Sequence, residues 1–208
     1  MLKTILILLI AYLLGSIPFS YWLGKLFYKI DVRKSGSMSA GATNVLRVIG
    51  PKLAVPVLIL DILKGYLATQ LVNFFHVEAE PLFTYLKVGA GVLATIGHIF
   101  PVFAQFKGGK GIATMAGVLL GAVPQVMIFA FPVFLIIVII TKYVSLGSIT
   151  AAFSIPFVLY FFTNPGDNIL AVFAFVVFLI ALFTHRTNVQ RLLKGTENKL
   201  SFRKKKGR

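Results

Sequence analysis

Long apolar stretches separated by short basic segments recur along almost the whole sequence. Most are close to one bilayer thick, because a helix needs about 20 apolar residues to cross a hydrocarbon core of about 30 Å. Hydrophobic residues make up 58% of the chain and charged residues only 13%, so polar side chains cannot coat a globule of this size. The sequence therefore predicts an all-α integral membrane protein. The stretches cover residues 2–23, 53–75, 82–103, 112–141, 146–162 and 169–184.

Two of these stretches need closer interpretation. The first begins with Lys3 like a signal peptide, but it is long enough to span, lacks a small-x-small cleavage site and continues into a basic segment. The thirty uncharged residues from Ile112 to Thr141 exceed one untilted span and contain Gly121 and Pro124. We expect a short or re-entrant helix there, followed by a full one. The last two stretches are separated by a predicted turn at residues 164–167.

The basic residues predict how the helices are oriented. One arrangement places 18 of the 21 Lys and Arg residues in the cytoplasm and leaves Glu78, Glu80 and Asp167 outside, as the positive-inside rule favours. Since Lys110 and Lys142 then share a side, the chain between them has to turn back or cross twice. We expect about seven crossings, or five if the short helix is re-entrant, with the N-terminus outside and the C-terminus in the cytoplasm.

The formal net charge of +15 would suggest nucleic-acid binding in a soluble domain. In a membrane protein, cytoplasmic loops explain the same excess, which also suits anionic lipids and anionic substrates. We therefore expect anionic membrane lipids as partners and no nucleic acid. The chain has no Cys, and its six carboxylates and three His are widely spaced, so we expect no disulfide, metal site or cofactor.

Three predicted cytoplasmic segments, 33–50, 105–114 and 185–197, are more polar than topology requires. The first is rich in Ser, Gly and Ala, and it places Asn44 and Arg47 on one helical face, beside backbone N–H groups that can meet an anion. A flexible, positively charged loop explains this segment equally well.

The second segment reads Phe106-Lys107-Gly108-Gly109-Lys110-Gly111 and directly precedes a helical stretch. Glycine lets a backbone approach an anion closely and lysine supplies charge, so this is a candidate phosphate cradle. It is not a Walker A loop, because Ala104 and Gly111 occupy positions where that motif needs Gly and Ser or Thr.

The third segment, if helical, places His185, Asn188 and Leu192 on one face with Arg191 at its edge. An amphipathic helix bound to anionic lipid explains the arginines and leucines, but not His185 and Asn188. The basic tail, 198–208, is interpreted as lipid-facing or solvated.

Some polar residues lie within the spans themselves. Asp61 and Lys64 are three residues apart on one helix and can neutralise each other, either as a structural ion pair or in a functional role. His98 lies near the cytoplasmic end of its span, beside the glycine-rich segment, and is either a packed or a supporting residue. For Ser145, hydrogen bonding between helices is the simplest interpretation.

Taken together, these segments resemble the bacterial acyl-phosphate:glycerol-3-phosphate acyltransferases of the PlsY type, in the family's order along nearly the whole chain. One departure concerns the first loop, where Met38, Ser39 and Ala40 replace the usual Gly-Asn-Pro, and we expect retained activity with an altered local conformation. The matching pieces are Leu13–Phe19, Gly41–Val45 with Arg47, Leu60-Asp61 with Lys64-Gly65, Gly97-His98, Phe106–Gly111, Tyr143–Leu146, and His185-Arg186 with Asn188, Arg191 and Glu197.

The resemblance implies a single transmembrane acyltransferase domain over residues 1–208, in the bacterial inner membrane with a cytoplasmic active site. It implies transfer of a long-chain acyl group from acyl phosphate to the sn-1 hydroxyl of glycerol 3-phosphate, giving lysophosphatidic acid, with the soluble enzyme that makes acyl phosphate as a candidate partner. The implied catalytic residues are Ser37, His185 and Asn188, and the supporting ones are Thr43, His98 and Glu197. The implied substrate-binding residues are Asn44, Arg47, Lys107, Gly108, Gly109, Lys110, Gly111, Ser145 and Arg191.

The implied reaction needs no acyl-enzyme, because an acyl phosphate is already activated and a hydroxyl can attack it directly. Two phosphates bring roughly three to four negative charges, for which Arg47, Lys107 and Lys110 are counter-charges. Either His185 or the substrate's own phosphate takes the hydroxyl proton. The His-x4-Asp pair of the other glycerophosphate acyltransferase class is absent after both His98 and His185, which disfavours a thioester donor.

A transporter for a phosphorylated solute is the alternative function, with basic loops and broken helices forming its site. Against it, the polar residues cluster at one face and no internal repeat is visible. A small membrane scaffold would leave Ser37, Asn44 and His185 without a purpose.

Overall fold

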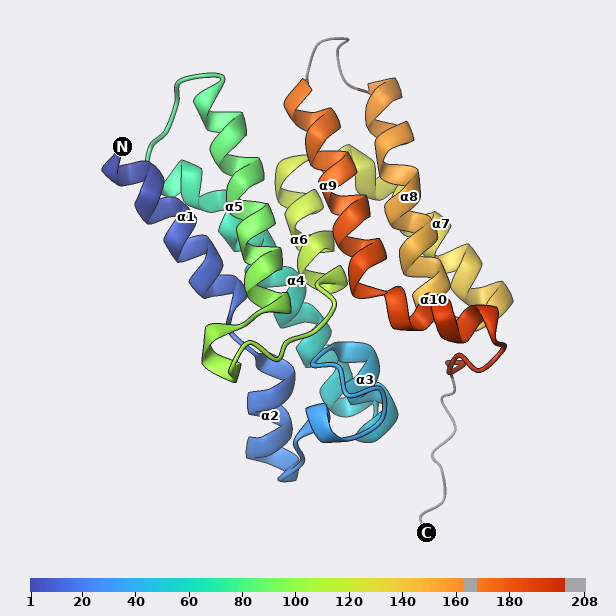
Figure 1. Cartoon of the computed structure of the whole chain (residues 1–208). Helices are drawn as coiled ribbons and strands as arrows, with labels where there is room; N and C mark the ends of the chain where they lie inside the picture. The colour runs from blue at the N-terminus through green and yellow to red at the C-terminus, as the bar shows by residue number, and fades with distance from the viewer. Residues whose placement is uncertain (163–167, 201–208) are drawn as a thin grey trace.

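The computed structural model describes residues 1–162 and 168–200, and over these ranges the regular structure is entirely helical (Figure 1). The predicted turn at 164–167 and most of the basic tail lie outside the described residues. The α-helices are α1 (Leu2–Gly15), α2 (Phe19–Tyr28), α3 (Ala42–Val48), α4 (Pro51–Phe74), α5 (Leu82–Ile99), α6 (Ile112–Ala122), α7 (Pro124–Thr141), α8 (Val144–Phe162), α9 (Asn168–Thr184) and α10 (Arg186–Leu193), with 3₁₀ turns at Val32–Lys34 and Val102–Ala104.

Five segments of the described chain are long and apolar enough to cross a membrane, and the bent pair α9 and α10 adds a sixth. The first span runs from Leu2 to Tyr28 and is broken between α1 and α2, whereas the sequence predicts one unbroken stretch. Pro18 lies in this break and cannot donate a backbone hydrogen bond, which accounts for the interruption. The number of crossings and their orientation stay predictions.

The 30-residue uncharged stretch forms a short helix and then a full one, as predicted. Helix α6 has 11 residues, and at 1.5 Å per residue it is about 16 Å long, roughly half the hydrocarbon core. It ends at Ala122, and α7 begins at Pro124, because a proline is tolerated at the first position of a helix.

Close backbone contacts hold the central helices together. A Cβ on Gly65 of α4 would lie 2.0 Å from the carbonyl oxygen of Thr114, and one on Gly117 of α6 would lie 1.9 Å from that of Ile62. Small residues at such crossings are typical of membrane helices, which gain little from hydrophobic association in lipid. Helices α1 and α5 approach each other in the same way at Gly15. The packing fixes the start of α6, directly after the glycine-rich loop, against the middle of α4.

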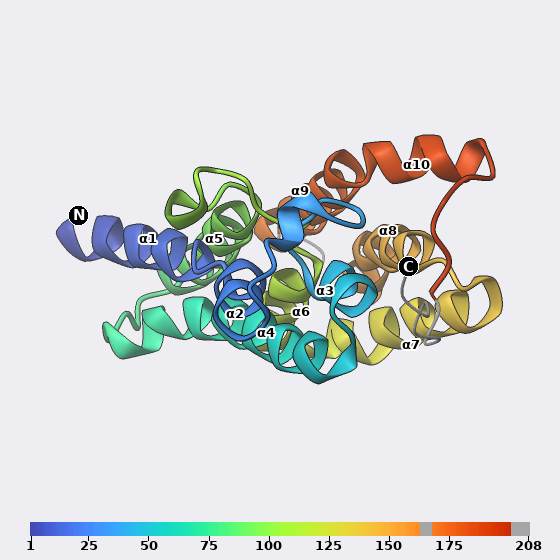
Figure 2. The same ribbon diagram turned by 90° about the horizontal axis from the view of Figure 1, so that it is seen from below.

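The polar segments gather at one end of the bundle. Figure 1 shows α2, α3, α10 and the loop after α5 at the end away from the N-terminus. Helix α10 runs across this end, because it is bent by 61° from α9. Figure 2, viewed from below, shows these elements spread over the same face. Segments distant in sequence therefore meet at one end of the molecule.

Candidate active site

The loop before α3 is held in shape by Asn44, whose side chain is buried. Its Oδ1 accepts a hydrogen bond from the backbone N–H of Ser37 at 2.8 Å, and its Nδ2 donates to the carbonyl oxygens of Val32 and Ser35 at 2.7 and 3.1 Å. The segment is thus ordered by one side chain. Both the oxygen and the nitrogen of this amide are thus hydrogen-bonded within the loop, so the geometry supports a role of Asn44 in positioning Ser37. A direct contact of Asn44 with substrate stays a prediction.

Met38 lies in the part of the first loop where the sequence departs from the family it resembles, and its φ is +58°. This left-handed region costs a residue with a Cβ about 1–2 kcal/mol. The same loop contains Gly36 at φ +64°. The loop therefore carries local strain at Met38, and an altered conformation relative to the family stays a prediction.

The glycine-rich loop is clamped between two other segments. The backbone N–H of Gly109 donates to the carbonyl of His98 at 3.1 Å, and that of Ala40 donates to the carbonyl of Gly108 at 3.2 Å. A Cβ on Gly108 would lie 2.0 Å from the His98 carbonyl oxygen, and one on Gly109 would lie 2.2 Å from His98 Nε2. The protein's own packing therefore requires both glycines, and Ala40 joins this loop to the one that carries Ser37.

Gly109→Ala is expected to raise the KM for glycerol 3-phosphate more than it lowers kcat. The added Cβ pushes the loop away from His98 and moves Lys110, without removing a side chain that takes part in the reaction. Steady-state kinetics of the purified enzyme measure this. Gly41→Ala is the matched control, since nothing lies within 4 Å of its Cβ position. An unchanged KM with a reduced kcat would contradict the expectation.

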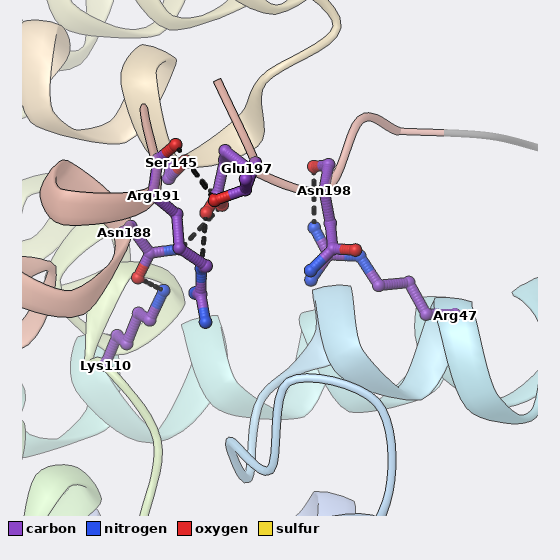
Figure 3. Close-up of polar contacts among 8 residues, drawn as sticks. Arg47, Lys110, Ser145, Asn188, Arg191, Glu197 and Asn198 are labelled. Atoms are coloured by element: carbon purple, nitrogen blue, oxygen red, sulfur yellow. Dashed lines mark hydrogen bonds and ion pairs between the residues drawn. The ribbon is translucent and has the colours of Figure 1, made fainter. Parts of the chain in front are cut away.

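Four predicted site residues converge on Glu197 (Figure 3). The carboxylate of Glu197 accepts hydrogen bonds from Ser145 Oγ at 2.9 Å, Asn188 Nδ2 at 2.7 Å and Arg191 Nε at 2.8 Å. Lys110 Nζ donates to the Oδ1 of the same Asn188. Residues of the α5–α6 loop, α8, α10 and the segment after α10 therefore form one polar network around a buried carboxylate.

Arg47 reaches the segment after α10 from α3. Its Nη2 donates to the carbonyl oxygen of Asn198 at 3.3 Å, as Figure 3 shows. Its Nε is buried and has no hydrogen-bond partner among the described residues. The Arg47 guanidinium thus keeps an unused donor next to the Glu197 network.

The charges of this network favour binding of an anion. Burial lowers the pKa of Lys110 to about 8, opposed by nearby Glu197, so the amine remains mostly protonated at pH 7. Burial alone would raise the pKa of Glu197, but hydrogen bonds from Arg191, Asn188 and Ser145 outweigh it and lower the value. One carboxylate therefore faces three cations, which leaves net positive charge for an incoming phosphate.

His185 lies directly after α9 and is buried. Its Nδ1 is 2.8 Å from the carbonyl oxygen of Ala181, and since a carbonyl only accepts, Nδ1 carries the proton and Nε2 is free to accept. Burial, reinforced by the charge of Lys110, lowers the pKa of His185 to about 4. The ring is therefore neutral at pH 7 and suited to accept a hydrogen bond from a hydroxyl.

Other predicted residues lie around this network. Ser37 and Thr43 are partly buried near the start of α3, and Lys107 is exposed at the start of the glycine-rich loop, so their direct roles stay predictions. The sequence analysis missed Asn198 and Ala40, which contribute backbone atoms that no residue-type pattern reveals. It assigned Glu197 only a supporting role, although Glu197 is the one acidic residue after Asp167, in a region with nine Lys and Arg.

Comparison with known proteins decides the family. A family model described as glycerol-3-phosphate acyltransferase matches residues 5–195. The chain belongs to the glycerol-3-phosphate acyltransferase family. Acyltransferases of this name from Fusobacterium nucleatum and Enterococcus faecalis are 42% and 44% identical to it over 195 and 209 residues. These matches cover 94% and 97% of this chain, and 97% and 94% of the relatives.

Two solved structures of the integral membrane acyltransferase PlsY are also similar. Its glycerol 3-phosphate form has a TM-score of 0.85 and 38% identity, covering 95% of this chain and 96% of that one. Its lysophosphatidic acid form has a TM-score of 0.81 and 37% identity, with 96% of both chains covered. The resemblance found in the sequence is thereby confirmed, as is the integral membrane fold. Membership of this family sets aside the transporter and scaffold alternatives.

Proposed function

We propose that this acyltransferase transfers an acyl group from acyl phosphate to the sn-1 hydroxyl of glycerol 3-phosphate, at the cytoplasmic face of the bacterial inner membrane. The products are lysophosphatidic acid and phosphate. The observation that carries the proposal is the cluster of Arg47, Lys110 and Arg191 around one buried carboxylate, because the reaction has to hold two phosphates at once. Two forms of the similar PlsY structure, with glycerol 3-phosphate and with lysophosphatidic acid, support the same substrate and product here.

The reaction follows from these groups without an enzyme-bound acyl intermediate. The sn-1 oxygen attacks the acyl carbonyl carbon, a new ester C–O bond forms, and the bond between that carbon and the phosphate oxygen breaks. Lys110 and Arg47 stabilise the charge of the departing phosphate. Glu197 keeps Asn188, Ser145 and Arg191 in place around it, so catalysis depends mainly on positioning and on charge.

The hydroxyl proton has two candidate acceptors, His185 Nε2 and a phosphate oxygen of the substrate. An imidazole whose pKa is about 4 is a weak base. The second pKa of a phosphate monoester is about 6, closer to the working pH, which favours the substrate phosphate. His185 then accepts a hydrogen bond from the substrate and orients it.

His185→Asn is expected to keep substantial activity, on the order of a tenth or more, since a true base contributes typically ~10²–10⁴ in rate. The Asn amide can still donate to the Ala181 carbonyl. The pH–rate profile should keep its limb near the phosphate pKa of about 6, and His76→Asn, in an exposed loop, is the matched control. Loss of more than about 10²-fold, with intact glycerol 3-phosphate binding and a vanished limb, would make His185 the base.

The donor is tested with purified enzyme in detergent and labelled glycerol 3-phosphate. Long-chain acyl phosphate, acyl coenzyme A and acylated carrier protein are supplied separately, and products are separated by thin-layer chromatography. We expect a lysophospholipid with acyl phosphate only, and NMR of the product distinguishes the sn-1 from the sn-2 ester. Equal product from a thioester donor would reject acyl phosphate as the specific donor.

The proposed orientation of the loops relative to the membrane is tested by cysteine labelling, because the natural chain has no Cys. Ser37→Cys, Gln105→Cys and Thr187→Cys are expected to resist an impermeant thiol reagent in intact cells and to react in inverted vesicles. Glu78→Cys, in the exposed α4–α5 loop, is the control expected to react from outside. Labelling of position 37 from outside intact cells would overturn the proposed topology.

A further inference from the structure

A second group of ionisable side chains lies buried beside the network described above and has no part in the proposed reaction. Asp61, Lys64 and His98 are 1%, 3% and 6% exposed. Lys64 Nζ lies 2.8 Å from Asp61 Oδ1, which confirms the ion pair expected from their spacing. Buried ion pairs are costly in a membrane and often no more stabilising than apolar residues of similar size. Stability alone therefore does not explain them.

Contacts at the Nδ1 side of the His98 ring hold the ring in place. Lys64 also donates to the carbonyl oxygen of Ile17, in the break between α1 and α2, at 2.9 Å. Asp61 Oδ1 lies 3.5 Å from His98 Nδ1, and Thr114 Oγ1 lies 3.0 Å from the same nitrogen. Groups from α4 and α6 thus fix the orientation of an imidazole on α5.

The other side of the same ring faces the glycine-rich loop. His98 Nε2 is so close to Gly109 that a Cβ there would lie 2.2 Å away, and the His98 carbonyl accepts the Gly109 N–H. A small pocket under the loop is lined by Asp61, Lys64, His98 and Gly108, so the ring forms part of the wall on which the loop rests. Lys110 directly follows Gly109 in the chain, and its ammonium donates a hydrogen bond to Asn188.

We propose that His98, held by the Asp61–Lys64 pair and by Thr114, is a positioning residue that fixes Gly108 and Gly109 and thereby places Lys110 for phosphate. The chain of contacts runs from the break between α1 and α2, through α4 and α5, to the loop. The inference rests on the proposed function only in assuming that Lys110 binds a substrate phosphate.

The first experiment measures binding and kinetics for His98→Ala. Equilibrium binding of labelled glycerol 3-phosphate needs no acyl donor, so its outcome is independent of which donor the enzyme uses. We expect Kd and KM to rise on the order of 10- to 100-fold, as for a misplacement of about 1 Å, with a smaller change in kcat. Thr69→Val, a buried substitution at the other end of α4, is the matched control for stability. A Kd equal to that of the control would overturn the proposal.

A double-mutant cycle tests whether His98 acts through Gly109. Both Gly109→Ala and His98→Ala disturb the same contact, so the double variant should bind glycerol 3-phosphate no more weakly than the weaker-binding single variant. Effects that simply multiply would overturn the proposed connection.

A milder substitution covers the case in which His98→Ala does not fold. Thr114→Val removes the hydroxyl that contacts His98 Nδ1 and leaves the ring in place. It should raise the Kd for glycerol 3-phosphate several-fold, because one of the buried hydrogen bonds that orient the ring is lost. An unchanged Kd in the folded variant would contradict the proposal. Wild-type turnover with acyl phosphate, measured alongside, tests the proposed reaction separately.

Discussion

Replacing Arg47 with lysine is expected to abolish nearly as much activity as replacing it with alanine. One terminal nitrogen of Arg47 donates a hydrogen bond to the Asn198 carbonyl, and the other N–H groups of the guanidinium can donate to an anion. A lysine retains the charge but cannot make both contacts from one planar group. Losing such a contact in a partly desolvated site costs about 2–4 kcal/mol, or on the order of 30- to 800-fold in kcat/KM.

Steady-state kinetics with both substrates check this expectation. Arg186→Lys is the matched control, because Arg186 is an exposed arginine of α10 that donates to the Phe183 carbonyl. Activity of Arg47→Lys within about threefold of wild type would mean that charge alone is required, since a factor of three is below 1 kcal/mol.

Lys110 is expected to give the enzyme an alkaline limit near pH 8. Its pKa is lowered to about 8 by burial, so the amine loses its charge as the pH rises through this value. In the free enzyme kcat/KM for glycerol 3-phosphate should fall above pH 8, whereas bound phosphate should move the limb of kcat to higher pH. Lys110→Met should lose on the order of 10²–10³ in kcat/KM at pH 7, as for removal of one electrostatic contact to the transition state.

Lys110→Arg distinguishes titration of this side chain from other causes. Arginine stays protonated throughout the range, so its residual activity should lack the alkaline limb. Titration of Lys110 does not itself destabilise the fold, because the folded state binds fewer protons at Lys110 than the unfolded state between pH 8 and 10.5, and this group therefore makes the fold more stable as the pH rises there. Lys194→Met, exposed at the end of α10, is the control. A limb that persists in Lys110→Arg would contradict the assignment.

Much of the fold follows from hydropathy, because bilayer thickness fixes the length of a span. The short α6 is foreseen from Gly121 and Pro124, and the Asp61–Lys64 pair from helical spacing. The break of the first span is not foreseen, although Pro18, which accounts for it, is visible in the sequence. The course of α10 across the bundle is not foreseen either, since it depends on tertiary contacts. Apolar composition alone does not show where a helix bends.

The sequence predicts which residues belong to the site better than it predicts how they contact one another. Lys110, Ser145, Asn188 and Arg191 are all expected there, and the structure brings them together at Glu197. Asn44 is expected at substrate, yet its amide is used to shape the loop around Ser37. Contacts to backbone carbonyls, such as that of Asn198, depend on chain course and leave no mark in residue type.

The order of the network residues along the chain, with Glu197 after all of its side-chain partners, has a consequence for biosynthesis. Lys110 and Ser145 are made and inserted well before Asn188 and Glu197, their hydrogen-bond partners. Domains form as the ribosome delivers the chain from its N-terminus, so the growing chain carries the loops of the site without the carboxylate that joins them. The network is therefore complete only once α10 and the segment after it have been made, and a chain cut short after α9 would lack the carboxylate that joins its loops.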